Sequence, residues 1–430
     1  MTHSKNGPPT ASRRRFLIGA AGIAGATGAA SRAMAARQAH AQRESTSCAL
    51  ALPFHGAHQG GIATPAQSHT YFAVFDVTCE KREDLISVLR LWTEAAARMT
   101  QGLPVGVAAQ DPSAPPVDSG ESESLGGSRL TLTFGFGATL FAKDGADRFG
   151  LAARRPAALV DLPRFVGDQL VPARTGGDLS VQACADDPQV AFHAVRQLGR
   201  LADGMVKLRW VQAGFLSRPG PTATPRNLMG FKDGTMNPST NDPGLMNQFV
   251  WVGDESGAWM RGGSYVVARP ARIALEHWDR MKVSFQEETM GRMKASGAPI
   301  GATQEFAPLD LDAVDKEGNP VIAENAHARL ASPQANDGAQ ILRRSYSYDN
   351  GVSFVAERWP PWRQGLEIDA GLLFLCYQRD PRTGFIKLFE RMSKFDMMNQ
   401  FVTHIGGGLF ACPGGVAKGR YLAQDLFERT

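Results

Sequence analysis

The stretch MGFKDGTMNP, residues 229–238, places one acid, Asp233, between two glycines. Glycine and the Asn237-Pro238 pair favour irregular backbone, so the pattern predicts a loop. An acid on such a loop is a candidate for a chemical role, which makes Asp233 the first candidate residue. The alternative is a turn aspartate that hydrogen-bonds its own backbone, with Gly234 supplying a positive φ. Taken by itself, the pattern favours that alternative.

His327 lies in the polar segment ENAHARLASP. Neutral imidazole is the commonest side-chain metal ligand, but no second histidine lies three to five residues away. A zinc site built from local spacing is therefore not expected, whereas a single axial histidine suits a haem iron. The alternative is a surface or capping histidine, which is the simpler interpretation for one histidine among nine.

Two adjacent arginines, Arg343 and Arg344, stand in QILRRSYSY. If Ile341 and Leu342 begin a strand, alternation sends one arginine inward and the other outward. An inward arginine needs an anion as its partner, and that anion is either a ligand or the acid of an ordinary salt bridge. The glycine-rich IGGGLFACPGG at 405–415 lacks a phosphate-binding spacing, and Gly-x-Ser-x-Gly is absent.

Apolar patterns predict the elements that would position these residues. In the first half we expect strands at 69–77, 130–134, 179–184 and 207–213, and helices at 81–100 and 188–201. In the second half we expect strands at 265–268 and 371–378, one long helix at 273–294, and a helix following Pro381. Residues 42–68 are predicted to be an extended lead-in, and 101–128 a surface loop.

A weak internal repeat indicates two similar halves. LSVQACADDP and LLFLCYQRDP each give an apolar strand, a cysteine, an acid and a proline before an amphipathic helix. FLSRPGPTATP, near 215–225, has the composition of a connector. The pattern predicts an α+β fold of two ferredoxin-like domains, with antiparallel sheets and peripheral helices. We expect the domains at 42–218 and 219–430.

The N-terminal segment, residues 1–41, differs from the rest of the chain. It carries six basic residues and no acid, and Ser12-Arg13-Arg14-Arg15-Phe16-Leu17 precedes an apolar run too short to span a bilayer. It is predicted to be a twin-arginine signal peptide that directs a folded protein to the periplasm or the exterior. Removing these six residues changes the formal net charge from +4 to −2. The basic pI therefore gives no sign of nucleic-acid binding.

Cysteine usage adds no site. The five cysteines contain no Cys-x-x-Cys pair, and Cys79, Cys184 and Cys376 lie in or beside apolar strands. They are expected to be small buried side chains. No transmembrane segment is expected in the mature chain.

The order of the candidate motifs is more specific than any of them alone. GFKDGT at 230–235, His327, ILRR at 341–344, GLLFLCYQ at 371–378 and IGGG at 405–408 occur in an order that resembles the dye-decolourising peroxidases. These are haem enzymes with two ferredoxin-like domains of the dimeric α+β barrel type. Among them the chain looks most like the exported deferrochelatase/peroxidases of bacterial ferrous-iron uptake operons. The resemblance covers nearly the whole mature chain.

The resemblance implies roles for particular residues. His327 matches the proximal ligand of haem b (iron protoporphyrin IX), Asp233 the distal acid–base residue, and Arg343 the distal arginine. A shorter spacing from His327 leaves Arg344 open as that arginine. Further haem contacts are implied for Gly234, Thr235, Met236, Ser332, Pro333, Gln334 and Phe374. Gln334 stands where relatives often have an arginine that could pair with a haem propionate, so Arg329 is an alternative anchor.

The implied reaction is the oxidation of dyes, phenolics or porphyrinogen-type donors by hydrogen peroxide. A second reading is a deferrochelatase, which releases iron from haem and leaves the porphyrin intact. A reading of another class is a non-catalytic haem-binding protein of the envelope. Components of an iron-uptake system are possible partners, and a homodimer or larger assembly is expected. Tyr346, Tyr348 and Tyr377 could carry electrons, but packing is the simpler reading of each.

Overall fold

The computed structural model describes residues 51–106, 112–217, 220, 223–356 and 364–428, which belong to one compact unit that begins at Ala51. The predicted signal peptide, Cys48 and the predicted domain boundary between residues 218 and 219 all lie outside the described residues.

The first half of the chain confirms the predicted alternation of strands and helices. Its elements are β1 (His69–Val77), α2 (Arg82–Met99), β2 (Thr131–Gly137), α3 (Ala138–Phe141), β3 (Leu179–Ala185), α4 (Pro188–Leu201) and β4 (Val206–Phe215), with 3₁₀ turns η1 (Ala152–Arg154) and η2 (Pro172–Arg174). The strands are antiparallel in the order β4-β1-β3-β2. The Asp187 side chain caps α4 by accepting from the backbone N–H groups of Gln189 and Val190.

The second half repeats the strand order with longer connections. Its larger elements are α5 (Pro243–Phe249), β5 (Ser264–Ile273), α6 (Leu275–Trp278), α7 (Val283–Met290), α8 (His327–Leu330), β6 (Leu342–Arg343), β7 (Tyr346–Ala356), β8 (Gln364–Gln378), α9 (Lys387–Phe395), β9 (Val402–His404), β10 (Gly408–Cys412) and α10 (Gln424–Phe427). Shorter turns are η3 (Ala258–Met260), η4 (Gln334–Asn336), η5 (Arg382–Ile386) and η6 (Met397–Gln400). Across the sheet the strands of this half lie in the order β7-β8-β5-β10. Read in reverse and numbered within its own half, this is the same order as β4-β1-β3-β2.

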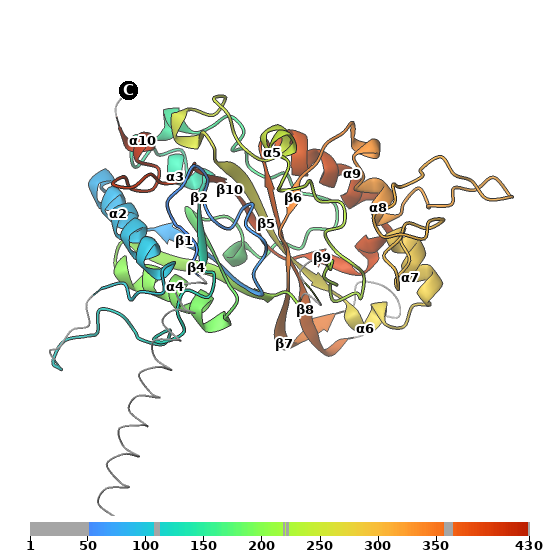
Figure 1. The fold of residues 1–430 in the computed structure, drawn as a ribbon, viewed down its shortest axis with the longest axis horizontal. Helices are drawn as coiled ribbons and strands as arrows, with labels where there is room; N and C mark the ends of the chain where they lie inside the picture. The colour runs from blue at the N-terminus through green and yellow to red at the C-terminus, as the bar shows by residue number, and fades with distance from the viewer. Residues whose placement is uncertain (1–50, 107–111, 218–219, 221–222, 357–363, 429–430) are drawn as a thin grey trace, which may run out of the picture. The chain divides into compact units, whose positions relative to one another are not determined.

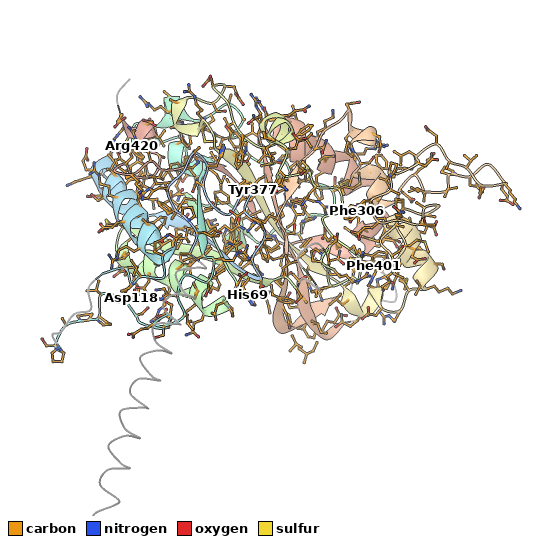
Figure 2. All side chains as sticks on the ribbon, viewed as in Figure 1. His69, Asp118, Phe306, Tyr377, Phe401 and Arg420 are labelled. Carbon is orange, nitrogen blue, oxygen red and sulfur yellow. The ribbon has the colours of Figure 1, made fainter. Side chains whose placement is uncertain are left out.

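The two sets of strands close into an antiparallel barrel. β10 pairs with β2 at one junction, and β4 pairs with β7 through Phe215 and Ser347 at the other. Large side chains fill the interior, as they do in barrels of about eight strands; they include Phe72, Trp210, Tyr346, Tyr348 and Tyr377. Tyr377 lies at the centre of the strands (Figure 2). The predicted α+β fold with peripheral helices is confirmed.

Helices cover the outer surface of the barrel on two sides. In Figure 1, α2 and α4 lie on the left of the strands, and α6, α7, α8 and α9 lie on the right. The apolar stripe expected on α2 is buried at Leu85, Val88, Leu89 and Trp92, whereas Leu91, expected on the same stripe, is 38% exposed. The Trp92 indole N–H donates to Leu198 O at 2.9 Å. The four described cysteines, Cys79, Cys184, Cys376 and Cys412, are buried free thiols, as expected for packing residues.

The single long helix predicted for 273–294 is wrong, because the chain breaks into α6 and α7. The Gln286 side chain donates to the backbone carbonyls of Trp278 (2.9 Å) and Met281 (3.3 Å), and so satisfies groups that a continuous helix would bond internally. α7 ends at Gly291, whose φ of 73° suits glycine. The apolar side chains expected on one side of that helix, Leu275, Trp278, Met281 and Phe285, still pack together in one cluster.

Candidate active site

A cavity lies over the outer face of β8, β5 and β9. It has a volume of about 1540 Å³, counting the part that is open to solvent. Its floor is formed by alternate side chains of the three strands: Leu372 and Phe374, Ala271 and Ile273, and Val402 and His404. Its walls come from the 227–236 loop, α8, α9 and the residues before β6. A mainly apolar floor with polar groups at the walls is typical of a ligand site.

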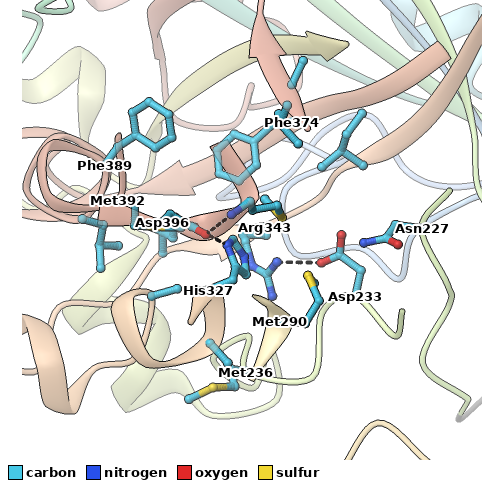
Figure 3. A pocket seen from close by; sticks show the side chains of 18 of the residues that line it. Asn227, Asp233, Met236, Met290, His327, Arg343, Phe374, Phe389, Met392 and Asp396 are labelled. Atoms are coloured by element: carbon cyan, nitrogen blue, oxygen red, sulfur yellow. Dashed lines mark hydrogen bonds and ion pairs between the residues drawn. The ribbon is translucent and has the colours of Figure 1, made fainter. Parts of the chain in front are cut away.

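Asp233 reaches across the chain to Arg343. The guanidinium NH1 of Arg343 donates to Asp233 Oδ1 at 2.6 Å, and both side chains line the cavity while remaining partly exposed, at 26% and 20%. Figure 3 shows this ion pair. The backbone N–H of Asp233 donates to Pro225 O. The carboxylate is thus directed at a cation 110 positions away, and not at its own turn.

The loop that carries Asp233 is fixed from both sides. The Asn237 side chain donates to Arg343 O (2.8 Å) and accepts from Arg343 N (3.1 Å), which joins the loop to β6. Gly234 has a φ of 110°, a conformation that other residues rarely adopt. Glu305 binds Lys232 and accepts from Thr235 Oγ1 at 3.1 Å. Burial alone would raise the pKa of Glu305, but these hydrogen bonds hold it below its ordinary value.

The adjacent arginines point to opposite faces of the sheet. Leu342 pairs with Tyr377 and Arg343 with Cys376, so Arg343 projects toward the cavity. Arg344 instead binds Thr64 O and the Gln67 side chain, and is 6% exposed. The sequence predicted one arginine inward and one outward, and the pairing register assigns each to its face.

His327 lies on the other wall of the cavity. It begins α8, and its Nδ1–H donates to Asp396 Oδ2 at 2.7 Å, because an ionised carboxylate can only accept. Asp396 is 5% exposed, and its other oxygen accepts from Met398 N at 2.8 Å. This contact leaves the Nε2 lone pair of His327 free, which is the arrangement of a metal-ligating histidine. His327, Asp396, Arg343 and Asp233 lie together in Figure 3.

His404 is a second imidazole of the cavity. Arg269 Nε donates to His404 Nδ1 at 3.3 Å, and Arg269 itself pairs with buried Asp168. The His404 ring lies edge-on to Phe389, with 4.8 Å between centroids. Burial, reinforced by the Arg269 charge, holds the pKa of His404 well below its ordinary value. His404 is therefore a neutral ring with its Nε2–H free to donate.

The other predicted contact residues divide into two groups. Gly234, Thr235, Met236, Pro333 and Phe374 line the cavity together with Asp233, His327 and Arg343. Ser332 and Gln334 are not among the described lining residues.

Ser332 is fully buried and shapes the turn after α8. Its hydroxyl donates to Arg329 O at 2.8 Å and accepts from Ala335 N at 3.2 Å. Gln334 is exposed. Arg329, the alternative anchor, binds the backbone carbonyls of Ile322 and Leu311 and holds that loop to α8.

Sequence reasoning missed Asp396, Asn237 and His404. Asp396 follows α9 in SKFDMMNQ, where an acid that caps the next turn was the available signal. Asn237 belongs to the MGFKDGTMNP stretch but was read only as a loop marker. His404 immediately precedes the glycine-rich IGGG, and only the glycines of this stretch were considered in the sequence.

A second cavity, of about 1170 Å³, shares the lining residues Asn227, Asp233, Gly234, Arg343 and Leu372 with the first. Its remaining lining includes Thr64, Thr224, Ser345 and Arg344. The ion pair thus stands between two hollows of different character, one mainly apolar and one more polar.

Two general properties complete the description. Within the described part of the chain, no cluster of three or more His, Cys, Asp or Glu side chains is arranged to hold a metal ion. Among the same residues, no helix has the length and hydropathy needed to cross a bilayer.

Comparison with known proteins identifies the family to which the chain is similar. The N-terminal domain model of the Dyp-type peroxidases matches residues 59–216, and the C-terminal model matches residues 224–417. The dye-decolorizing peroxidase of Thermobifida fusca is 39% identical over 86% of this chain and 84% of its own. The deferrochelatase of Escherichia coli K12 is 37% identical over 99% of both chains.

Solved structures agree. A DyP-type peroxidase from Streptomyces coelicolor superposes with a TM-score of 0.79 at 40% identity, covering 88% of this chain and 97% of that one. Enzymes of this type carry haem and use hydrogen peroxide with a reducing donor. The matched ranges, the identities and the shared fold therefore establish this chain as a member of the Dyp-type peroxidase family, a haem-dependent enzyme.

Proposed function

We propose that this enzyme activates hydrogen peroxide between His327 on one side and the Asp233–Arg343 pair on the other. The observation that carries the proposal is the convergence of these three residues, distant in sequence, on one cavity. The cavity suits a haem: its floor is apolar, and because Asp396 holds Nδ1 of His327, Nε2 would be available to bind the haem iron.

Bound haem supplies the redox-active iron, and the chain supplies proton transfer and electrostatics. Asp233 accepts a proton from peroxide and returns it to the departing oxygen, so that one carboxylate serves as base and then as acid. Arg343 stabilises the negative charge that develops on that oxygen. The Asn237 contacts keep both groups in place. The second, more polar cavity offers a small polar oxidant a path to the same pair.

Peroxide turnover by purified, haem-loaded variants tests these roles. Asp233→Asn and Arg343→Leu should each lower kcat for a small phenolic donor by ~10²–10³, the usual cost of losing one preorganised group. The Soret band should remain, because His327, and neither of these residues, would bind the haem iron. Arg379→Lys is the control, because Arg379 pairs with Glu255 at 2.7 Å outside the lining of both cavities. Full activity in Asp233→Asn would refute the acid–base role, whereas a haem-loaded wild type that does not turn over peroxide would favour a carrier without catalysis.

The second candidate is iron release from haem. It is favoured by the deferrochelatase relative, which matches this chain from end to end. Both reactions use the same cavity, so they are separated by assay: haem supplied without oxygen or peroxide yields free protoporphyrin only if iron is released. If no protoporphyrin forms while peroxidase turnover is intact, iron release is excluded and the peroxidase function remains.

We also propose export as a folded protein by the twin-arginine route, with a periplasmic or secreted location, on the basis of residues 1–41. The repeated strand order and the separate family matches support two ferredoxin-like domains, divided near residues 218 and 219. Components of an iron-uptake system remain proposed partners.

Self-association is proposed through the β7–β8 hairpin. Val352 faces Ile368 and Phe354 faces Leu366 across the two strands, and these side chains are 43–74% exposed on one face. An isolated two-stranded hairpin is marginal in water. Four such side chains present on the order of 400 Å² of apolar surface, so two copies packed face to face would bury about 800 Å² through them, and a specific interface of about 1,200 Å² needs further contacts around the hairpin.

A further inference from the structure

Methionines are concentrated around the active-site cavity. Met229, Met236, Met290, Met392 and Met398 all line it, and no cysteine is among its described lining residues. A thioether is polarisable and adapts to irregular apolar surfaces. It is also readily oxidised to a sulfoxide, which is polar. Thioethers are therefore the most oxidisable groups at the place where peroxide would be activated.

Met236 is the most accessible of the five. Its side chain is 36% exposed, whereas Met229 and Met290 are 2% and 7% exposed, and Met392 and Met398 are intermediate. It follows Asp233 by three residues on the loop that Asn237 joins to β6. Figure 3 shows Met236 at the edge of the site, on the side of His327 and Arg343.

We propose that Met236 is a peroxide-dependent modification site, where oxygen transfer converts the thioether to methionine sulfoxide. The sulfur loses two electrons and gains one peroxide oxygen, the O–O bond breaks, and the other oxygen leaves as water with both protons. The proposal rests on the proposed peroxidase function, which supplies the oxidant. A sulfoxide here places a polar, chiral group at the rim of the cavity.

The chain provides its own matched control. Met293 is also 36% exposed but lies outside the lining of both cavities. Reaction with free peroxide in solution depends on exposure, and should oxidise the two methionines at similar rates. Oxygen transfer inside the site should favour Met236, because a group held beside the reacting centre has a high effective concentration.

The experiment follows sulfoxide at both methionines by peptide mass spectrometry. Haem-loaded and haem-free protein are treated with hydrogen peroxide without a reducing donor. We expect Met236 to oxidise about tenfold or more faster than Met293 in haem-loaded protein, and at a similar rate in haem-free protein. Haem-loaded Asp233→Asn should lose most of the preference, because the peroxide is no longer activated.

Three outcomes overturn the proposal: equal rates in haem-loaded wild type, an equal preference for Met236 without haem, or an undiminished preference in Asp233→Asn. Failure of the proposed function has a different signature, since the wild-type protein would then show no Soret band or consume no peroxide. A wild type that binds haem and consumes peroxide, yet oxidises Met236 and Met293 equally, refutes only the modification site.

Discussion

Replacing Asp396 with asparagine tests how the enzyme orients its histidine. Asp396 is almost fully buried and accepts two hydrogen bonds, one from His327 Nδ1 and one from Met398 N. Asparagine offers one acceptor oxygen and one donor group, so one of these two donors must face an N–H group. If the amide N–H faces His327, the imidazole must move its proton to Nε2, which is the atom needed for the iron.

The size of the effect on haem binding follows from this loss of one hydrogen-bond acceptor. A buried donor left without a partner costs about 1–3 kcal/mol, and 1.4 kcal/mol corresponds to tenfold in an equilibrium constant. We expect the haem dissociation constant of Asp396→Asn to rise about 10–100-fold, the usual effect of losing a ligand's hydrogen-bond partner. The iron reduction potential should also rise, because a less basic imidazole stabilises the ferric state less.

The assay is a titration of haem-free protein with haem, followed at the Soret band, with urea unfolding of the same samples. Asp242→Asn is the control, because Asp242 caps α5 through Gly244 N and Leu245 N outside both cavities. Because asparagine caps a helix about as well as aspartate does, this variant should leave both stability and haem affinity close to wild type. A dissociation constant for Asp396→Asn within about twofold of wild type would refute this account of His327.

Two further predictions concern pH and assembly. The depressed pKa of His404 means that the unfolded chain binds a proton there that the folded chain does not. The stability this contributes is complete above the unfolded pKa of about 6.5 and falls below it by up to ~1.4 kcal/mol per pH unit. His404→Gln should flatten that slope in urea unfolding between pH 7.5 and 5.5; an unchanged slope contradicts the expectation. For assembly, Phe354→Ser should weaken concentration-dependent association in sedimentation velocity, whereas Phe306→Ser, at 70% exposure on a loop, should not; equal behaviour of the two variants would exclude the hairpin as the interface.

Much of the fold could be read from local pattern. β1 occupies the predicted residues 69–77, and α4 begins at the proline of the Asp-Asp-Pro signal. β5 was predicted too short, because Arg269 and Pro270 interrupt its apolar run. Arg269 is tolerated in the strand since it pairs with buried Asp168. That contact joins residues 101 positions apart, and no local pattern contains it.

For the candidate site, too, local sequence predicted the residues but not their contacts. Residue types identified Asp233, His327 and the Arg343-Arg344 pair as candidates, but each had an ordinary alternative reading. The family resemblance predicted their roles, which the proposed experiments test. The Asp233–Arg343 contact spans 110 positions and the His327–Asp396 contact spans 69. Such pairings depend on tertiary packing, so spacing alone could not choose between a ligand site and surface salt bridges.

The opposite directions of Arg343 and Arg344 set a limit on how the chain can vary. The connection from α8 to β6 forms part of the cavity wall, through Pro333, Ala339 and Ile341, and it must also deliver the chain to Leu342 in the correct register. A shift of β6 by one position would exchange the two guanidinium groups. The cavity would lose the partner of Asp233, and the barrel interior would lose the cation that holds Thr64 and Gln67. The Arg343-Arg344 dipeptide thus contributes both to the packing of the barrel and to the active-site cavity. Insertions near it are tolerated only where they preserve the pairing of β6 with β8.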